Sequence, residues 1–141
     1  MDVSGNQRWL GTVILLGIVY LVVGIGFGAL AGSSASTQMR VAWRLAAWLA
    51  SGVAFGAHIG YEHSRLRNSP TRVALHASVA VALGAFGLAV AANVHTHWAA
   101  SSHQRSLLLS ALVLWPALAA VPAFVVALAA AAGLARTRRG A

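Results

Sequence analysis

The chain has 141 residues, of which 59% are hydrophobic and only 9% are charged, and its formal net charge is +8. About a quarter of the residues of a soluble globular protein are charged, so this composition excludes an ordinary soluble domain and favours a membrane protein. Cysteine is absent, which excludes disulfides and thiolate metal sites. Asp2 and Glu62 are the only acidic residues, which argues against hydrolytic, phosphoryl-transfer and di-iron chemistry. We therefore do not expect an enzyme.

Four apolar runs are long enough to cross a bilayer core of about 30 Å, which takes about 20 helical residues. They cover residues 9–32, 41–61, 71–94 and 107–135. The connections between them are short and no change of composition marks a boundary. The sequence predicts an all-α fold: one transmembrane domain over residues 1–141, built as an up-down-up-down four-helix bundle.

The first run resembles a cleavable signal peptide in one respect, because the small residues of "ALAGSSAS" lie at its end. The run is longer than the apolar core of such a signal, which has about 7–15 residues. The positive charge in front of it is also weak, since Asp2 offsets Arg8. We expect an uncleaved first helix.

Small residues at helical spacing predict close packing between helices, because only small side chains let two backbones approach each other in lipid. The first and second runs each carry such a stripe of small residues on one helix face, and the third run has small residues in one sector. The predicted packing glycines are Gly17, Gly24, Gly28 and Gly32 in the first run, Gly52, Gly56 and Gly60 in the second, and Gly84 and Gly87 in the third. Unused small faces could also support self-association.

The second run ends in the stretch "FGAHIGYEHSRLRNSP", which combines histidine, glutamate and arginine. His58, Glu62 and Arg65 share one helix face, whereas the glycine stripe lies on roughly the opposite face. After the turn, Ser69 and Pro70 form a typical helix start. This start places His76 of the third helix at the same depth as His58.

Two histidines at one depth with a carboxylate nearby allow several kinds of chemistry. His58 and His76 could be the axial ligands of haem b, or could bind a transition metal that Glu62 ligates or orients. His58 and Glu62 could instead form a proton relay. In the alternative without a site, these side chains reach the membrane surface and Glu62 pairs with Arg65.

A second group of histidines lies in the segment "NVHTHWAASSH" before the fourth run. His95, His97 and His103 could bind a metal such as Cu(II), Zn or Ni, or could be solvated loop residues. In the fourth run, Pro116 and Pro122 remove backbone donors and favour kinks.

The arginines predict the topology, because loops on the cytoplasmic side carry the excess of positive charge. Three arginines flank the first turn and the third, namely Arg40, Arg44 and Arg105. Seven lie on the opposite side: Arg8, Arg65, Arg67, Arg72, Arg136, Arg138 and Arg139. We expect a multi-pass protein of the cell (inner) membrane with both termini in the cytoplasm.

The scattered arginines form no basic stripe, so a nucleic-acid partner is not expected. The expected partners are the lipid bilayer and another membrane protein or a second copy of the chain. The function predicted first is that of a non-enzymatic accessory or oligomer-forming membrane subunit. The alternatives are a membrane redox or metal-binding protein using His58 and His76, and a small transporter or channel with a His58–Glu62 relay.

Overall fold

The protein is described by a computed structural model that covers residues 3–96 and 102–137. It contains four helices, α1 (Val3–Ser33), α2 (Thr37–Ser64), α3 (Pro70–Thr96) and α4 (Ser102–Thr137). The predicted all-α fold and the order of its helices are confirmed. Each helix extends beyond its apolar run, and α2 begins where the Ser36 side chain accepts a hydrogen bond from the Met39 backbone N–H at 3.2 Å.

Three helices are long and apolar enough to cross a membrane, over Trp9–Ser33, Pro70–His95 and Gln104–Thr137. The remaining predicted span, residues 41–61 of the second run, lies in α2, which has 28 residues but is less apolar than the other helices. Its first turns carry Arg40 and Arg44, and its last turns carry polar side chains as well. The apolar helices therefore support association with a membrane, and α2 belongs to the same helical assembly.

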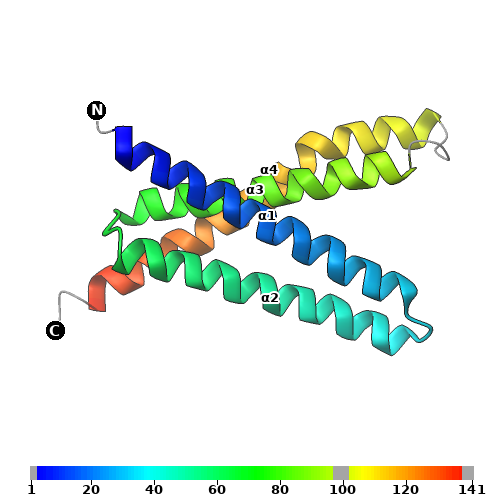
Figure 1. Ribbon diagram of the computed structural model, residues 1–141, viewed down its shortest axis with the longest axis horizontal. Helices are drawn as coiled ribbons and strands as arrows, with labels where there is room; N and C mark the ends of the chain where they lie inside the picture. The colour runs from blue at the N-terminus through cyan, green and yellow to red at the C-terminus, as the bar shows by residue number, and fades with distance from the viewer. Residues whose placement is uncertain (1–2, 97–101, 138–141) are drawn as a thin grey trace.

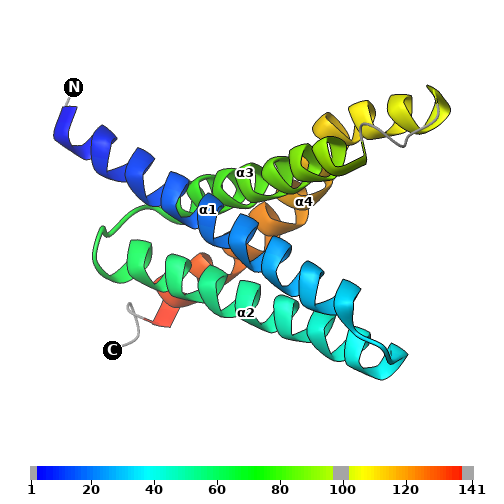
Figure 2. The ribbon, with the colours of Figure 1, turned by 45° about the vertical axis from the view of Figure 1, so that its right-hand side comes forward.

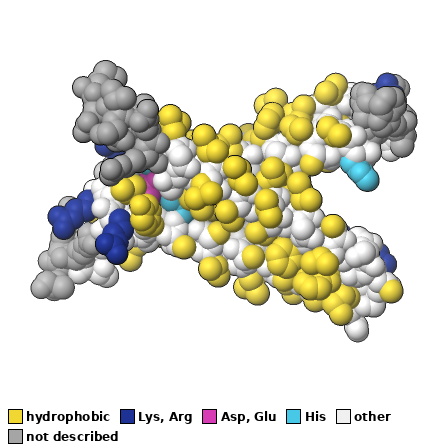
Figure 3. All heavy atoms as spheres, viewed as in Figure 1, with side chains coloured by type: hydrophobic (Ala, Val, Ile, Leu, Met, Phe, Trp, Pro, Cys, Tyr) yellow, Lys and Arg dark blue, Asp and Glu magenta, His cyan; other side chains and the backbone are white. Residues whose placement is uncertain are grey.

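Consecutive helices run antiparallel and form two hairpins, α1–α2 and α3–α4, which cross each other (Figures 1 and 2). The contact between α3 and α4 is the most extensive, and α1 crosses α3 near the middle of both helices. Within the described residues, α1 and α4 make no contact. The hairpins diverge toward the α1–α2 turn and the end of α3, and a notch separates them there in Figure 3.

The buried core lies around the crossing and near the α2–α3 turn, and alanine dominates it. One cluster joins α2, α3 and α4 through Ile59, Val73, Ala74, Ala77, Ala127 and Ala131. A second joins α1 and α3 through Val13, Tyr20 and Ala80. Most large apolar side chains elsewhere are exposed, which suits a surface that faces lipid tails (Figure 3).

Four of the predicted packing glycines lie in close contacts between α1 and α3. A Cβ atom on Gly17 would lie 3.0 Å from Leu83 Cβ. A Cβ atom on Gly24 would lie 2.7 Å from Leu88 Cδ1. On α3, a Cβ on Gly84 would lie 2.5 Å from Tyr20 Cβ, and one on Gly87 would lie 3.0 Å from Leu21 Cδ1. The two backbones approach closely because these positions lack a side chain.

The other predicted packing glycines have open space where a side chain would begin. A Cβ atom would meet nothing within 4 Å at Gly28, Gly32, Gly52, Gly56 and Gly60. Within the single chain, the prediction of close packing is wrong at these five positions. Four-residue spacing shows that small residues share a face but not which face the neighbouring helix covers. The face of α2 that is buried near its end, where Ile59 packs against α3 and α4, carries His58, Ile59 and Glu62 instead.

The two prolines of the fourth run lie inside α4, which remains helical from Ser102 to Thr137. Pro116 and Pro122 therefore do not end the helix, as is common for proline in apolar helices. The kinks expected there stay a prediction.

Candidate polar site at the α2–α3 turn

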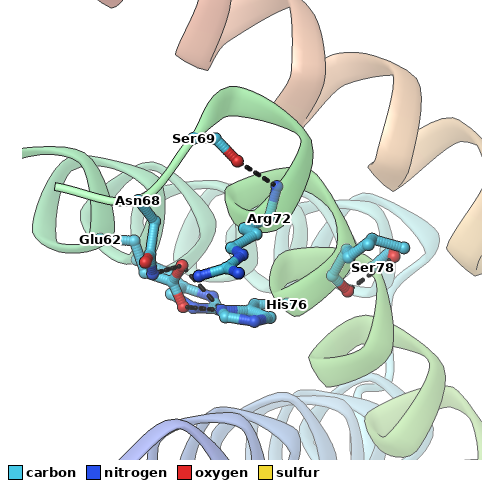
Figure 4. Close-up of polar contacts among 8 residues, drawn as sticks. Glu62, Asn68, Ser69, Arg72, His76 and Ser78 are labelled. Carbon is cyan, nitrogen blue, oxygen red and sulfur yellow. Dashed lines mark hydrogen bonds and ion pairs between the residues drawn. The ribbon is translucent and has the colours of Figure 1, made fainter. Parts of the chain in front are cut away.

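The polar residues of the second run meet those of the third because the α2–α3 turn is short. His58 and Glu62 are one helical turn apart on α2, and both are buried. At the start of α3, the backbone N–H of Arg72 donates to the Ser69 hydroxyl at 3.5 Å. The turn folds α3 back against α2, so His76 lies beside the Glu62 carboxylate (Figure 4).

The Glu62 carboxylate is the centre of the site and contacts three side chains. His58 Nε2 lies 3.1 Å from Oε1, and His76 Nδ1 lies 2.8 Å from Oε1 and 2.9 Å from Oε2. The side-chain amide of Asn68 donates to Oε2 at 3.0 Å. We call these four residues the carboxylate cluster. It connects α2, the turn and α3 through one buried group.

Burial constrains the protons of the carboxylate cluster. Glu62 is 0% exposed and His58 is 2% exposed, so water contributes little to their solvation. An ionised carboxylate only accepts hydrogen bonds, so His58 must carry its hydrogen on Nε2 and His76 on Nδ1 when Glu62 is charged. His58 Nδ1 is buried and has no partner among the described residues. The cluster therefore carries one negative charge when both rings are neutral, and binding one proton makes it neutral.

Helix α1 closes the cluster from a third direction. The ring of Trp9 lies 5.0 Å from the ring of His76 between centroids, at an interplanar angle of 45°. The Trp9 Nε1 atom is buried without a partner in the described ranges. The candidate site predicted from the sequence included neither Trp9 nor Asn68. Contact across helices determines both roles, and the only local signal was the position of Asn68 in the turn.

Among the described residues, no arginine near this end of the molecule pairs with Glu62. Both ion pairs found among the described residues join Glu62 to a histidine. Arg65 is exposed at the end of α2, and its backbone N–H bonds to the Tyr61 carbonyl at 2.9 Å. The alternative in which Glu62 reaches the surface and pairs with Arg65 is wrong, because the carboxylate turns inward. Arg72 lies next to the cluster in Figure 4.

The arrangement does not fit the predicted haem. Two axial histidines must approach opposite faces of a flat macrocycle, whereas here both rings contact the same carboxylate oxygen. Glu62 thus lies where a haem would have to be. Among the described residues, no group of three His, Asp or Glu side chains is arranged to hold a metal ion either. Hydrogen bonding accounts for the contacts of the cluster.

The second histidine group is only partly within the described residues. His95 lies exposed near the end of α3. His97 lies outside the described ranges, and the side chain of His103 is not described although the residue belongs to α4. A metal site that combines the three therefore stays a prediction.

Comparison with protein-family models, curated proteins and solved structures found no match for this chain. Its function is therefore interpreted from the geometry of the carboxylate cluster and from the apolar helices around it.

Proposed function

We propose that this protein is a non-enzymatic, multi-pass membrane protein that responds to protons, acting as an accessory subunit. Its proton-binding group is the carboxylate cluster, and its response is a change in how firmly the end of α2 is held against α3 and α4. One observation carries the proposal: the carboxylate of Glu62 is completely buried and is bonded by two histidines. Buried ionisable groups in membrane proteins usually have a functional role.

The position of the cluster supports a proton-dependent change in packing. Histidine is the side chain whose charge ordinarily changes near neutral pH. One added proton neutralises the cluster, whereas two leave a buried net positive charge, which is costly. Around the carboxylate cluster, α1 contributes the neutral Trp9 and α3 contributes Arg72. The α4 residues of the nearby apolar core, Ala127 and Ala131, carry no charge. Binding of the second proton should therefore weaken the contacts that hold α2.

A proton channel is less well supported by the interior of the protein. Beyond the cluster, the buried residues along α3 are Ala77, Ser78, Ala80, Ala85 and Ala89. The Ser78 hydroxyl donates to the carbonyl of Leu75 in its own helix at 2.9 Å. No chain of polar groups leads away from Glu62 among the described residues, so we favour a proton response at one end over conduction.

Trp9 provides the test, because its ring lies 5.0 Å from that of His76. Its emission is obtained as the difference between the wild-type protein and Trp9→Phe in detergent, followed over a pH titration. We expect this emission to change on acidification, since a charge on His76 alters the field at the indole. Glu62→Gln should shift the midpoint, because the amide carries no negative charge to stabilise a protonated histidine.

His95→Gln is the matched control, since His95 lies exposed near the far end of the same helix, and it should leave the midpoint unchanged. The proposal fails if Trp9 emission does not titrate, or if Glu62→Gln titrates like the wild type, as His95→Gln should. Proton flux into liposomes that depends on Glu62 would assign a relay instead.

A further inference from the structure

At the opposite end of the α1–α2 hairpin from the carboxylate cluster, the two helices enclose a groove of about 450 Å³. Residues of both helices line it: Gly24, Phe27, Gly28, Ala31 and Gly32 from α1, and Arg40, Arg44, Ala47 and Trp48 from α2. The α1 side consists mainly of glycine and alanine. A Cβ atom on Gly28 or Gly32 would meet nothing within 4 Å, so missing side chains leave part of this space open.

Two arginines give the groove a charged end near the α1–α2 turn. Arg40 and Arg44 are one helical turn apart, and both line the groove. The Nε atom of Arg40 donates to the Ser34 carbonyl at 3.3 Å, which holds this side chain at the turn. Arg44 makes no hydrogen bond or ion pair with the described part of the chain. The guanidinium groups therefore retain donors for a ligand.

The described part of the chain does not supply an anion for these arginines. Its only acidic residues are Asp2, which is outside the described residues, and Glu62. Glu62 is separated from Arg44 by about 27 Å along α2, and its carboxylate is already bonded in the cluster. An anion at Arg40 and Arg44 must therefore come from outside the described chain. Arginine binds phosphate through paired N–H donors, and phosphate is the anion of the membrane surface.

We propose that this groove binds one anionic phospholipid from the surrounding bilayer. The phosphate contacts Arg40 and Arg44, and one acyl chain lies along the apolar floor between Gly32 and Gly24. This floor extends for about 12 Å along α1, in the direction that leads from the headgroup level toward the middle of the membrane. Phe27 supports one wall, since its ring packs on Trp43 with centroids 5.9 Å apart.

The test measures lipid binding to the purified full-length protein in detergent. Phosphatidylglycerol and phosphatidylcholine with identical acyl chains are titrated, and bound lipid is counted by native mass spectrometry. We expect one phosphatidylglycerol to bind more tightly than phosphatidylcholine. The double variant Arg40→Gln/Arg44→Gln should weaken phosphatidylglycerol binding by roughly thirtyfold, since each arginine near an anionic surface contributes about a factor of five.

Two matched controls separate the groove from general charge and shape effects. Arg65→Gln/Arg67→Gln removes the same charge from the exposed α2–α3 turn and should leave binding unchanged. Gly28→Leu fills the floor and should weaken the binding of both lipids. Gly26→Leu lies on the same helix, also has open space around its Cβ position, does not line the groove and should have no effect.

Four results would overturn the proposal. The two lipids could bind equally, or the double arginine variant could bind phosphatidylglycerol like the wild type. Inorganic phosphate could raise the unfolding temperature as much as the lipid does at equal concentration, which would assign a site for the free anion. Finally, dimers that bind no lipid and dissociate in Gly28→Leu would show that a second copy covers the groove.

Discussion

Gly84 of α3 packs directly on Tyr20 of α1. A Cβ atom at Gly84 would lie 2.5 Å from the Cβ of Tyr20 and 3.2 Å from the carbonyl oxygen of Gly17. Neither of these neighbours is the end of a flexible side chain that could turn aside. The crossing of the two hairpins therefore depends on the absence of a single carbon atom at this position.

Gly84→Ala should consequently destabilise the protein, although alanine forms helices better than glycine. Overpacking of this kind costs about 1–3 kcal/mol. Gly52→Ala is the control, since a Cβ there meets nothing within 4 Å, and it should be neutral or stabilise by up to about 1 kcal/mol. Unfolding in detergent, followed by circular dichroism, measures both. Equal stability of the two variants would contradict the close crossing.

Glu62→Ala should destabilise the α2–α3 end of the molecule, because three donors lose their common acceptor. Breaking a buried charged network costs about 3 kcal/mol. Asn68→Ala removes only one of the three bonds and should cost about 1 kcal/mol. His95→Ala, at the exposed end of α3, should have almost no effect on the same unfolding measurement. An effect of Glu62→Ala no larger than that of His95→Ala would show that the cluster does not hold the helices together.

The purified protein should be colourless, and removal of metal should not change its stability. One nitrogen of each histidine ring, His58 Nε2 and His76 Nδ1, already contacts Glu62. The measurements are an absorption spectrum, elemental analysis, and the unfolding temperature before and after treatment with a chelator. A Soret band that disappears in His58→Ala, or stoichiometric metal that depends on His76, would contradict the hydrogen-bonded arrangement.

Both termini should lie in the cytoplasm, because seven of the ten arginines lie on that side of the predicted topology. A reporter that is active only in the cytoplasm, fused after Ala141, should be active. The same reporter inserted between Ser34 and Ser36, in the α1–α2 turn, should be inactive. The reverse pattern would show the opposite orientation.

The sequence alone predicted four helices at about the right positions and four apolar runs, of which three lie in helices apolar enough to cross a membrane. These properties are local, since hydropathy and length are read along one segment at a time. It also determined that His58 and Glu62 share a face, because residues four apart on a helix are neighbours. The depth of His76 followed from the helix start at Ser69 and Pro70.

Which helix faces meet could not be predicted from the sequence and became clear from the fold. Gly84 packs on α1 while Gly28 and Gly56 face open space, although all belong to similar runs of small residues. Glu62 bonds to His76 across the turn and not to Arg65 on its own helix. Helical periodicity shows which residues of a helix lie on one stripe, but not which neighbouring helix packs against that stripe. The partner depends on how the two hairpins cross, which is set by contacts between residues far apart in the chain.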